Sequence, residues 1–207
     1  MSVSSRLNTT PRRVPQQRRG KRRVSALLDT AAAVIAEKGY EQATMSEIAR
    51  RAHSSIGSLY QFFPNKQAVA EAVREQYIED INRSWTDLVG VAAKLSPEQL
   101  SRRLVTVQLE IVERHPALLA LLEIPPTSRT WRRRELIRVR VAMALMAHKP
   151  RLGESKALRI ASVVQLVSRG LLTLYAKSDD RERAGIVEEF KAVLVGYLAP
   201  KLKSQRG

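Results

Sequence analysis

The sequence predicts an all-α protein, and three observations lead to that prediction. From residue 24 onward, apolar residues recur three or four positions apart in almost every segment, which is the period of an amphipathic helix. Capping residues and Gly or Pro breaks separate these segments, and no stretch alternates apolar and polar residues as a half-buried strand does. The 207 residues are enough for one or two compact domains with a sizeable core.

The N-terminal part of the chain is expected to contain four helices. Gly39 ends the first, and Thr44 with Glu47 three residues later has the spacing of a capping box for the second. Pro64 ends the third, and Asn65 caps a long fourth helix whose apolar stripe continues to residue 88. These helices are expected over residues 24–39, 44–52, 55–63 and 65–88.

Five further helices are expected after residue 95, which brings the total to about nine. Ser96 followed by Pro97 is an N-cap with proline at the first helical position. Prolines at 125–126 and turn residues at 149–153 and 178–180 separate the later segments. These helices are expected over residues 96–115, 117–123, 127–148, 154–177 and 181–199.

The charge is unevenly distributed along the chain. The formal net charge is +16, and residues 1–23 contribute +8 because they hold eight Arg or Lys residues and no acid. This segment has no apolar period, so we expect a basic arm that is disordered in isolation and helical near its end. It lacks the apolar centre of a signal peptide, and a transit peptide is the minor alternative on composition alone. A basic excess of this size indicates a polyanionic partner.

Several classes of chemistry find no support in the sequence. Cysteine is absent, which excludes disulfides, thiolate metal sites and cysteine nucleophiles. His53, His115 and His148 stand far apart and outside any metal-binding spacing. No P-loop, GxSxG or GxGxxG motif occurs, so we predict no enzyme, no metal and no cofactor. No apolar run approaches the roughly 18 residues of a membrane helix, so we expect a cytoplasmic protein with no membrane partner.

Residues 44–66 have the spacing of a helix-turn-helix. The tight connection at 52–54 joins two short helices, which would place the first across a DNA backbone and the second in the major groove. Gly57 and Ser58 are small, so the start of the second helix is free to approach base edges closely. The segment therefore predicts double-stranded DNA as a partner.

Three motifs in this region agree in order and separation with one family. They are Glu37-Lys38-Gly39-Tyr40, Thr44-Met45-Ser46-Glu47-Ile48-Ala49 and Ser55-Ile56-Gly57-Ser58-Leu59-Tyr60-Gln61-Phe62-Phe63-Pro64-Asn65-Lys66. Over residues 22–75 the chain resembles the TetR family of bacterial transcriptional regulators, and beyond residue 80 the resemblance is one of architecture. It implies a basic arm (1–23), a three-helix helix-turn-helix DNA-binding domain (24–68) and a helical effector-binding and dimerisation domain (69–207).

The resemblance also implies which residues touch DNA. Thr44, Tyr60 and Lys66 match positions that hold phosphates. The positions that face base edges are Ile56, Gly57, Ser58 and Gln61.

Two departures from the family pattern bear on this interface. A turn position that is commonly glycine is His53 here, and the next, commonly apolar, is Ser54; a left-handed turn is feasible for histidine. Residues 24–80 carry a net charge of −3, so we expect the arm to supply the missing positive charge at phosphates or in a minor groove. The arm residues concerned are Arg12, Arg13, Arg18, Arg19, Lys21, Arg22 and Arg23.

Apolar stripes on the last two helices have two interpretations. An ordinary monomer core is one, and a four-helix homodimer interface, which the resemblance implies, is the other. A dimer would place two recognition helices about one DNA turn apart on a quasi-palindromic operator. The expected interface residues are Val163, Val167, Gly170, Leu171, Leu174, Phe190, Val193, Leu194 and Tyr197.

The resemblance places an effector pocket among the middle helices, roughly residues 81–175, without identifying the small molecule. The candidate lining residues, each more often plain core or surface on its own, are Trp85, Gln108, Trp131, Met143, Met146 and Gln165. A cluster of arginines either selects an anionic effector or forms a solvated helix start, and the second interpretation ranks first. The cluster comprises Arg129, Arg132, Arg133 and Arg134.

The prediction for the whole chain is a cytoplasmic, homodimeric, ligand-responsive transcriptional regulator. In this family such a protein is most often a repressor, and the long helix from Asn65 is expected to transmit effector binding to the DNA-binding domain as a pendulum. The alternative is an architectural DNA-binding protein dominated by its arm and weakly sequence-specific. An enzyme with a vestigial helix-turn-helix is a third hypothesis, but it lacks a catalytic constellation.

Overall fold

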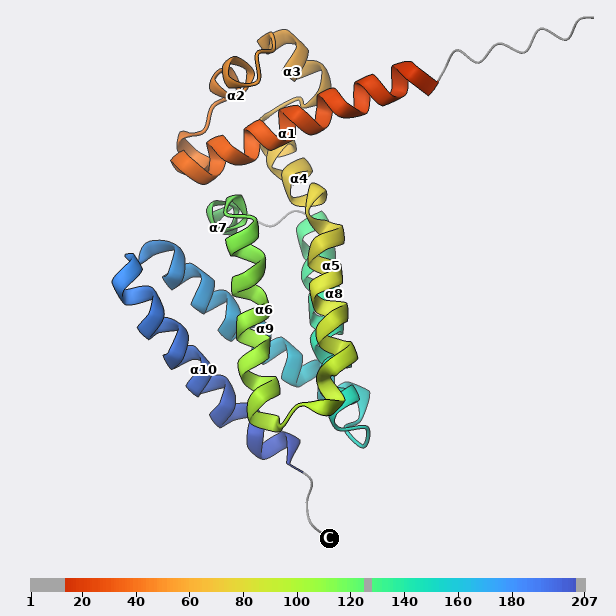
Figure 1. Ribbon diagram of the computed structural model, residues 1–207, viewed down its shortest axis with the longest axis vertical. Helices are drawn as coiled ribbons and strands as arrows, with labels where there is room; N and C mark the ends of the chain where they lie inside the picture. Colours follow the sequence, from red (N-terminus) through yellow and green to blue (C-terminus); the bar gives the residue numbers. More distant parts are fainter. Residues whose placement is uncertain (1–13, 125–127, 204–207) are drawn as a thin grey trace, which may run out of the picture.

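The computed structural model describes residues 14–124 and 128–203, with side chains at 20–122, 124, 132 and 134–203. Every regular element in these ranges is helical, and the described helices comprise nine longer α-helices and the single turn α7 (Figure 1). The predicted all-α class and helix number are confirmed. The first helices are α1 (Val14–Gln42), α2 (Met45–Arg51), α3 (Ile56–Phe62) and α4 (Lys66–Gln76). The others are α5 (Ile78–Val91), α6 (Pro97–Arg114), α7 (Ala117–Ala120), α8 (Ser128–His148), α9 (Glu154–Lys177) and α10 (Asp180–Leu202), with 3₁₀ turns at Ala92–Lys94 and Leu121–Glu123.

Helix α1 begins earlier than the expected start at residue 24. Its first residue is Val14, so the last part of the basic arm is helical and continuous with the DNA-binding domain (Figure 1). The regular helix ends at Gly39, whose φ of 79° is one that L side chains rarely adopt. The expected stop is therefore confirmed. Arg12 and Arg13 lie outside the described residues.

Two separate hydrophobic cores divide the molecule. The first lies among α1–α4 and is closed by residues of the α7 corner, whereas the second lies among α5, α6, α8, α9 and α10. Val69, Ala70 and Val73 of α4 belong to the first core. The division between the cores therefore falls at the α4–α5 junction rather than after residue 68.

The long helix expected from Asn65 to residue 88 is interrupted at Tyr77. This residue has φ −95° and ψ −1° and separates α4 from α5. Its ring stacks on His115, with 4.0 Å between ring centroids, and His115 Nε2 lies 2.9 Å from the Asp80 carboxylate. Apolar residues continue in phase across the interruption, which is why the periodicity did not reveal it. The expected single pendulum helix is therefore two helices with a joint.

Candidate nucleic-acid interface

The turn between α2 and α3 is built on His53. This residue adopts φ 48°, and its backbone N–H donates to Arg50 O at 3.2 Å. The backbone N–H of Ser54 donates to Ala49 O at 2.9 Å. These two bonds form a Schellman motif, in which a residue with left-handed backbone angles follows the helix. The two bonds satisfy carbonyl oxygens in the last turn of α2 that have no partner within the helix. The expected left-handed turn at histidine is confirmed.

Helix α3 presents one face to solvent and packs the other. Ser55 caps it, with its Oγ accepting from the backbone N–H of Ser58 at 3.2 Å. Leu59 is fully buried in the first core, which fixes the rotation of the helix about its axis. Ile56 is 43% exposed and Tyr60 is 49% exposed.

All four predicted base-contact residues lie on α3. Ile56, Gly57 and Gln61 are exposed, and Ser58 is half-buried. A Cβ placed on Gly57 would meet nothing within 4 Å, so its surface is open and flat. The structure brings these side chains together on a short, rigid helix with room for base edges.

The end of the basic arm reaches the same helix. Arg23, on α1, donates from Nη2 to Ser58 Oγ at 2.8 Å. Lys21 and Arg22 beside it are exposed, whereas Arg18 and Arg19 are helical with side chains outside the described set. Part of the predicted arm is thus held next to the predicted base-contact residues.

The three predicted phosphate-contact residues differ in their surroundings. Thr44 is the exposed N-cap of α2, and Tyr60 lies exposed on α3. Lys66 instead donates from Nζ to the backbone oxygens of Tyr40 at 2.8 Å and Glu41 at 3.0 Å. Its Nζ also lies 4.3 Å from the centre of the Tyr40 ring. Lys66 therefore joins the end of α1 to the start of α4, a role that the sequence did not predict.

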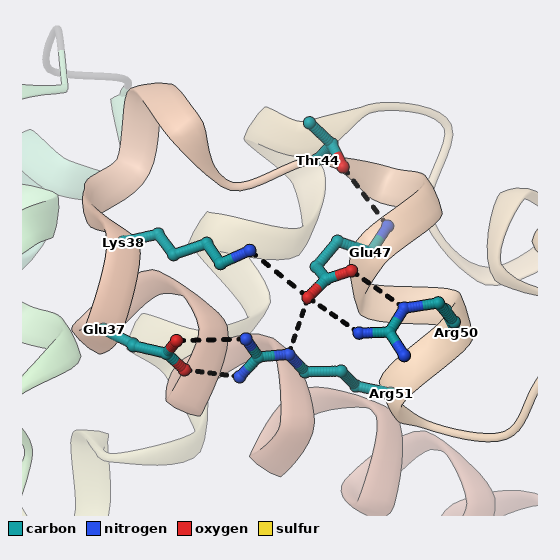
Figure 2. Close-up of polar contacts among 6 residues, drawn as sticks. All are labelled: Glu37, Lys38, Thr44, Glu47, Arg50 and Arg51. Carbon is teal, nitrogen blue, oxygen red and sulfur yellow. Dashed lines mark hydrogen bonds and ion pairs between the residues drawn. The ribbon is translucent and has the colours of Figure 1, made fainter.

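A charged network attaches α2 to α1 (Figure 2). The Glu47 carboxylate accepts from Arg50 Nε at 3.0 Å, Arg51 Nε at 2.7 Å and Lys38 Nζ at 3.3 Å. Arg51 also pairs with Glu37 on α1. The hydrogen bonds from Arg50 and Arg51 lower the pKa of Glu47 to about 2. The network therefore remains charged at neutral pH and sets the angle at which α2 leaves α1.

An apolar cavity of about 190 Å³ lies among α4–α9, beneath the DNA-binding domain. Trp85 and Gln108, two of the predicted effector residues, line it. Gln108 Nε2 is held by Leu104 O at 3.0 Å and Ser168 Oγ at 2.6 Å. Arg74 from α4 and Arg134 from α8 also line the cavity.

The other predicted effector residues lie elsewhere. Met143 is exposed on α8, and Met146 packs against the second core. Gln165 donates from Nε2 to the backbone oxygen of Arg134 at 2.7 Å and lies outside the cavity lining. The side chain of Trp131 is outside the described set. Helical period places these residues correctly on helices, but it does not reveal which helix face meets the cavity.

Sequence reasoning missed Arg74, which connects the cavity to the DNA-binding domain. Arg74 Nη1 donates to Glu71 Oε1 at 2.6 Å, and Nη2 donates to the backbone oxygen of Leu121. Both Arg74 and Glu71 are buried. The available signal was an i, i+3 acid–base pair on the otherwise apolar stripe of α4.

Comparison with known proteins identifies both halves of the chain. Residues 27–73 match the model of the N-terminal domain of bacterial regulatory proteins of the tetR family, and residues 96–198 match a tetracyclin repressor-like C-terminal domain. Together the two matches cover well over half of the chain. The chain belongs to the TetR family.

Sequence relatives of this TetR-family chain align with only part of it. The A-factor receptor protein of Streptomyces griseus is 43% identical over 51 residues, which are 25% of this chain and 18% of the receptor. The HTH-type transcriptional repressor KstR2 of Rhodococcus jostii is 28% identical over 101 residues, 49% of this chain and 48% of that protein. The chain thus spans about half or less of the length of these curated relatives.

Solved structures share the whole fold with this TetR-family chain. A TetR-family regulator of Pectobacterium atrosepticum has a TM-score of 0.65 at 19% identity, covering 94% of this chain and 100% of that one. FadR of Bacillus subtilis, solved with stearoyl-CoA, has a TM-score of 0.64 at 17% identity, covering 83% and 97%. At these identities the likeness shows the fold alone.

Helix α9 of this TetR-family chain is apolar on two sides. Ile160, Val164 and Leu171 lie in the second core, whereas Val163 and Leu166 are exposed, Leu166 by 71%. Because apolar residues lie on both sides of α9, its mean hydropathy reaches 1.4 over 18 residues, and a third of these residues are buried. Among the described helices, α9 is the one that is long and apolar enough to cross a membrane. The sequence analysis did not expect such a segment. A core helix passes the same test, so this is weak support for a membrane span.

The predicted dimer residues divide into two groups. Leu171 and Leu194 are fully buried within one chain, so their assignment to the dimer surface is wrong. Gly170 faces the ring of Phe190, 3.7 Å from where a Cβ would lie, which brings α9 close to α10 within the chain. Exposed apolar residues remain on these helices at Val163, Leu166, Leu174 and Val193, with Val167, Phe190 and Tyr197 half-buried beside them.

Proposed function

We propose that this chain is a homodimeric, cytoplasmic transcriptional regulator that binds a quasi-palindromic operator and releases it when a small-molecule effector binds. The observation that supports this most directly is the exposed face of α3. Ile56, Gly57 and Gln61 are exposed to solvent on a helix that the buried Leu59 anchors in the first core. An exposed helix of this kind fits the major groove.

Base reading and phosphate contact fall to different residues in this proposal. Ser58 and Gln61 read base edges, and Ile56 contacts a thymine methyl. Thr44 and Tyr60 contact phosphates and set the orientation of the helix. Lys21, Arg22 and Arg23 add phosphate contacts from the end of α1 that lies beside α3.

The exposed apolar residues of α9 and α10 support the dimer. Leu166, Leu174 and Val193 have apolar side chains at least about half exposed, which is costly on the surface of a monomer and favourable at an interface. A second copy packed on this face would form the four-helix interface expected from the family. It would also pair two α3 helices on one operator.

The joint at Tyr77 supports coupling between effector and operator. Arg74 lines the cavity and donates to the Leu121 backbone, while the rest of α4 packs against α1 in the first core. An effector that displaces Arg74 therefore moves α4 and changes the spacing of the DNA-binding domains. A coupling free energy of about 1–3 kcal/mol would lower operator affinity roughly 10-fold or more.

The test is fluorescence anisotropy with the palindrome nearest the gene's own promoter against a scrambled duplex, at two salt concentrations. We expect two chains per operator and binding at least about 1000-fold tighter than to the scramble. Gln61→Ala should relax specificity, whereas Tyr60→Phe should weaken both duplexes alike. Tyr175→Phe, which removes a hydroxyl on α9 far from α3, is the matched control.

The same assay separates the architectural alternative. Changing Lys21, Arg22 and Arg23 to Gln should reduce the log–log salt slope by about 0.9 for each lost phosphate contact and leave operator preference intact. Equal binding to both duplexes, lost in this triple variant, would establish an arm-dominated DNA-binding protein instead.

A further inference from the structure

Arg23 on α1 and Ser58 on α3 are joined by a hydrogen bond beside the other predicted base-contact residues. Arg23 Nη2 donates to Ser58 Oγ at 2.8 Å, and the two residues are 35 positions apart in the chain. Arg23 is exposed and Ser58 is half-buried. A guanidinium keeps its charge at physiological pH and has no acceptor atom, so the serine oxygen always accepts in this bond. The bond therefore fixes one of the two roles that are open to the hydroxyl.

The proton of the Ser58 hydroxyl is available to a partner outside the chain. Hydroxyls further along a helix donate to the carbonyl four residues earlier, as those of Thr30, Ser84 and Ser162 do at 2.9 Å, 3.1 Å and 3.0 Å. The carbonyl four residues before Ser58 belongs to Ser54, which precedes the N-cap of α3 and lies outside the helix. The helical geometry that brings such a carbonyl within reach therefore does not extend to Ser58.

A hydroxyl in this state acts towards DNA as a hydrogen-bond donor. Accepting a bond from a cation polarises the O–H group, which strengthens the bond that this group donates. The oxygen keeps a second lone pair, but an amino group that approached it would meet the positive charge of the guanidinium. In the major groove guanine, adenine and thymine each present an acceptor atom, whereas cytosine presents only its N4 amino group. Ser58 should therefore favour an acceptor base and disfavour cytosine.

We infer that Arg23 determines which bases Ser58 accepts: it holds the hydroxyl as a donor, so that α3 discriminates against cytosine at the base that Ser58 faces. Arg23 is a positioning residue in this inference, because it acts on the base through Ser58. The inference rests on the proposed function, since it deepens the base reading assigned to Ser58. A guanidinium has five N–H donors, so Arg23 is able to contact a phosphate through the others at the same time.

Fluorescence anisotropy with duplexes based on the palindrome nearest the gene's own promoter tests the inference. Each duplex carries one base-pair change in one half-site, and the position that becomes insensitive in Ser58→Ala is the one that Ser58 faces. There the original protein should bind an acceptor base at least about 10-fold more tightly than cytosine, which lies within the usual cost of one mismatched pair. Exchanging G·C for C·G makes this comparison at constant base composition.

Arg23→Met should reduce this preference to about 3-fold or less, and Arg23→Lys, which keeps a cationic donor, should restore part of it. Since the preference is a ratio between two duplexes, a lost phosphate contact weakens both alike and cancels. Arg22→Met is the matched control, because it removes the exposed cation next in sequence and should keep the full ratio. Every variant should still prefer the operator over a scrambled duplex, since only one base pair is affected. Thermal melts verify that each variant is folded.

The outcomes separate this inference from the proposed function. Specific operator binding in which Arg23→Met keeps the preference that Ser58→Ala loses would retain the proposed function and overturn the inference, because Ser58 would then read the base alone. Cytosine bound as tightly as guanine at the Ser58 position, or no position that becomes insensitive in Ser58→Ala, would have the same consequence. Equal binding to operator and scrambled duplex would remove the proposed function and the inference with it.

Discussion

Glu71 and Arg74 form a buried ion pair at the joint between the two domains, and its removal should be costly. Their side chains are 9% and 10% exposed, and the guanidinium is 2.6 Å from the carboxylate. Arg74→Met leaves a carboxylate in the joint without this partner, and breaking a buried pair in this way costs about 3–5 kcal/mol. For a chain of this length the melting temperature should fall by roughly 6–20 °C, at about 2–4 °C for each kcal/mol.

A double-mutant cycle isolates the contribution of the pair. Glu71→Met should also destabilise the protein, but the double change to Met replaces the pair with apolar groups of similar volume and should cost much less than the two single changes added. Urea unfolding followed by circular dichroism and by tryptophan fluorescence measures all four proteins. Arg102→Met is the control, because its pair with Glu188 is more than half exposed and contributes at most about 1 kcal/mol. Additive single effects, or a cost below about 1 kcal/mol for Arg74→Met, would refute the reasoning.

Three further predictions concern the DNA-binding domain. The pKa of Glu47 is lowered to about 2, so the ionised carboxylate stabilises the fold fully above the unfolded-state pKa near 4.3, and this stabilisation is lost as the pH falls towards 2. Glu47→Gln should therefore lower the urea midpoint at pH 7 and make that midpoint less sensitive to acid. A variant whose midpoint depends on pH as the original protein's does would contradict this prediction. His53→Gly should raise the free energy of unfolding by about 0.5–1 kcal/mol and His53→Val should lower it, since only glycine adopts φ 48° without strain. Thermal melts in which both variants have a lower melting temperature would count against the turn assignment. Lys66→Met should lower the melting temperature even without DNA, because Nζ bonds the backbone oxygens of Tyr40 and Glu41; a variant that loses operator affinity at unchanged stability would show a phosphate contact alone.

Capping residues in the sequence predicted the starts of α2, α4 and α6 well, although they gave no sign of where α1 and α5 begin. Ser96 and Gln99 form a complete capping box, and the Asn65 side chain accepts from a backbone N–H three residues later at 2.8 Å. At Thr44 half of the predicted box forms: Thr44 Oγ1 accepts from the backbone N–H of Glu47 at 3.2 Å, but the Glu47 carboxylate is held by cations from α1 and α2. Caps depend on residues within one turn, whereas the competing cations come partly from a distant helix.

Features that depend on packing between distant segments were not predictable from periodicity. The interruption at Tyr77 leaves the apolar stripe in phase, so the backbone angles of Tyr77 show it, whereas the periodicity of the sequence does not. Likewise, Leu171 and Leu194 have the spacing of an interface but lie in the core, because a helix that is apolar on two sides gives no sign of which side faces inward. Of the candidate site, the exposed face of α3 followed from motif spacing, whereas the cavity required the fold.

The bond from Arg74 to Leu121 ends on a main-chain oxygen. Nearly any amino acid at position 121 would offer the same acceptor, so substitutions there would alter packing while keeping the link. What the guanidinium responds to is the location of a stretch of backbone at the α7 corner. The hydrogen bond at the joint therefore depends on where the backbone of the α7 corner lies and does not depend on the side chain at position 121.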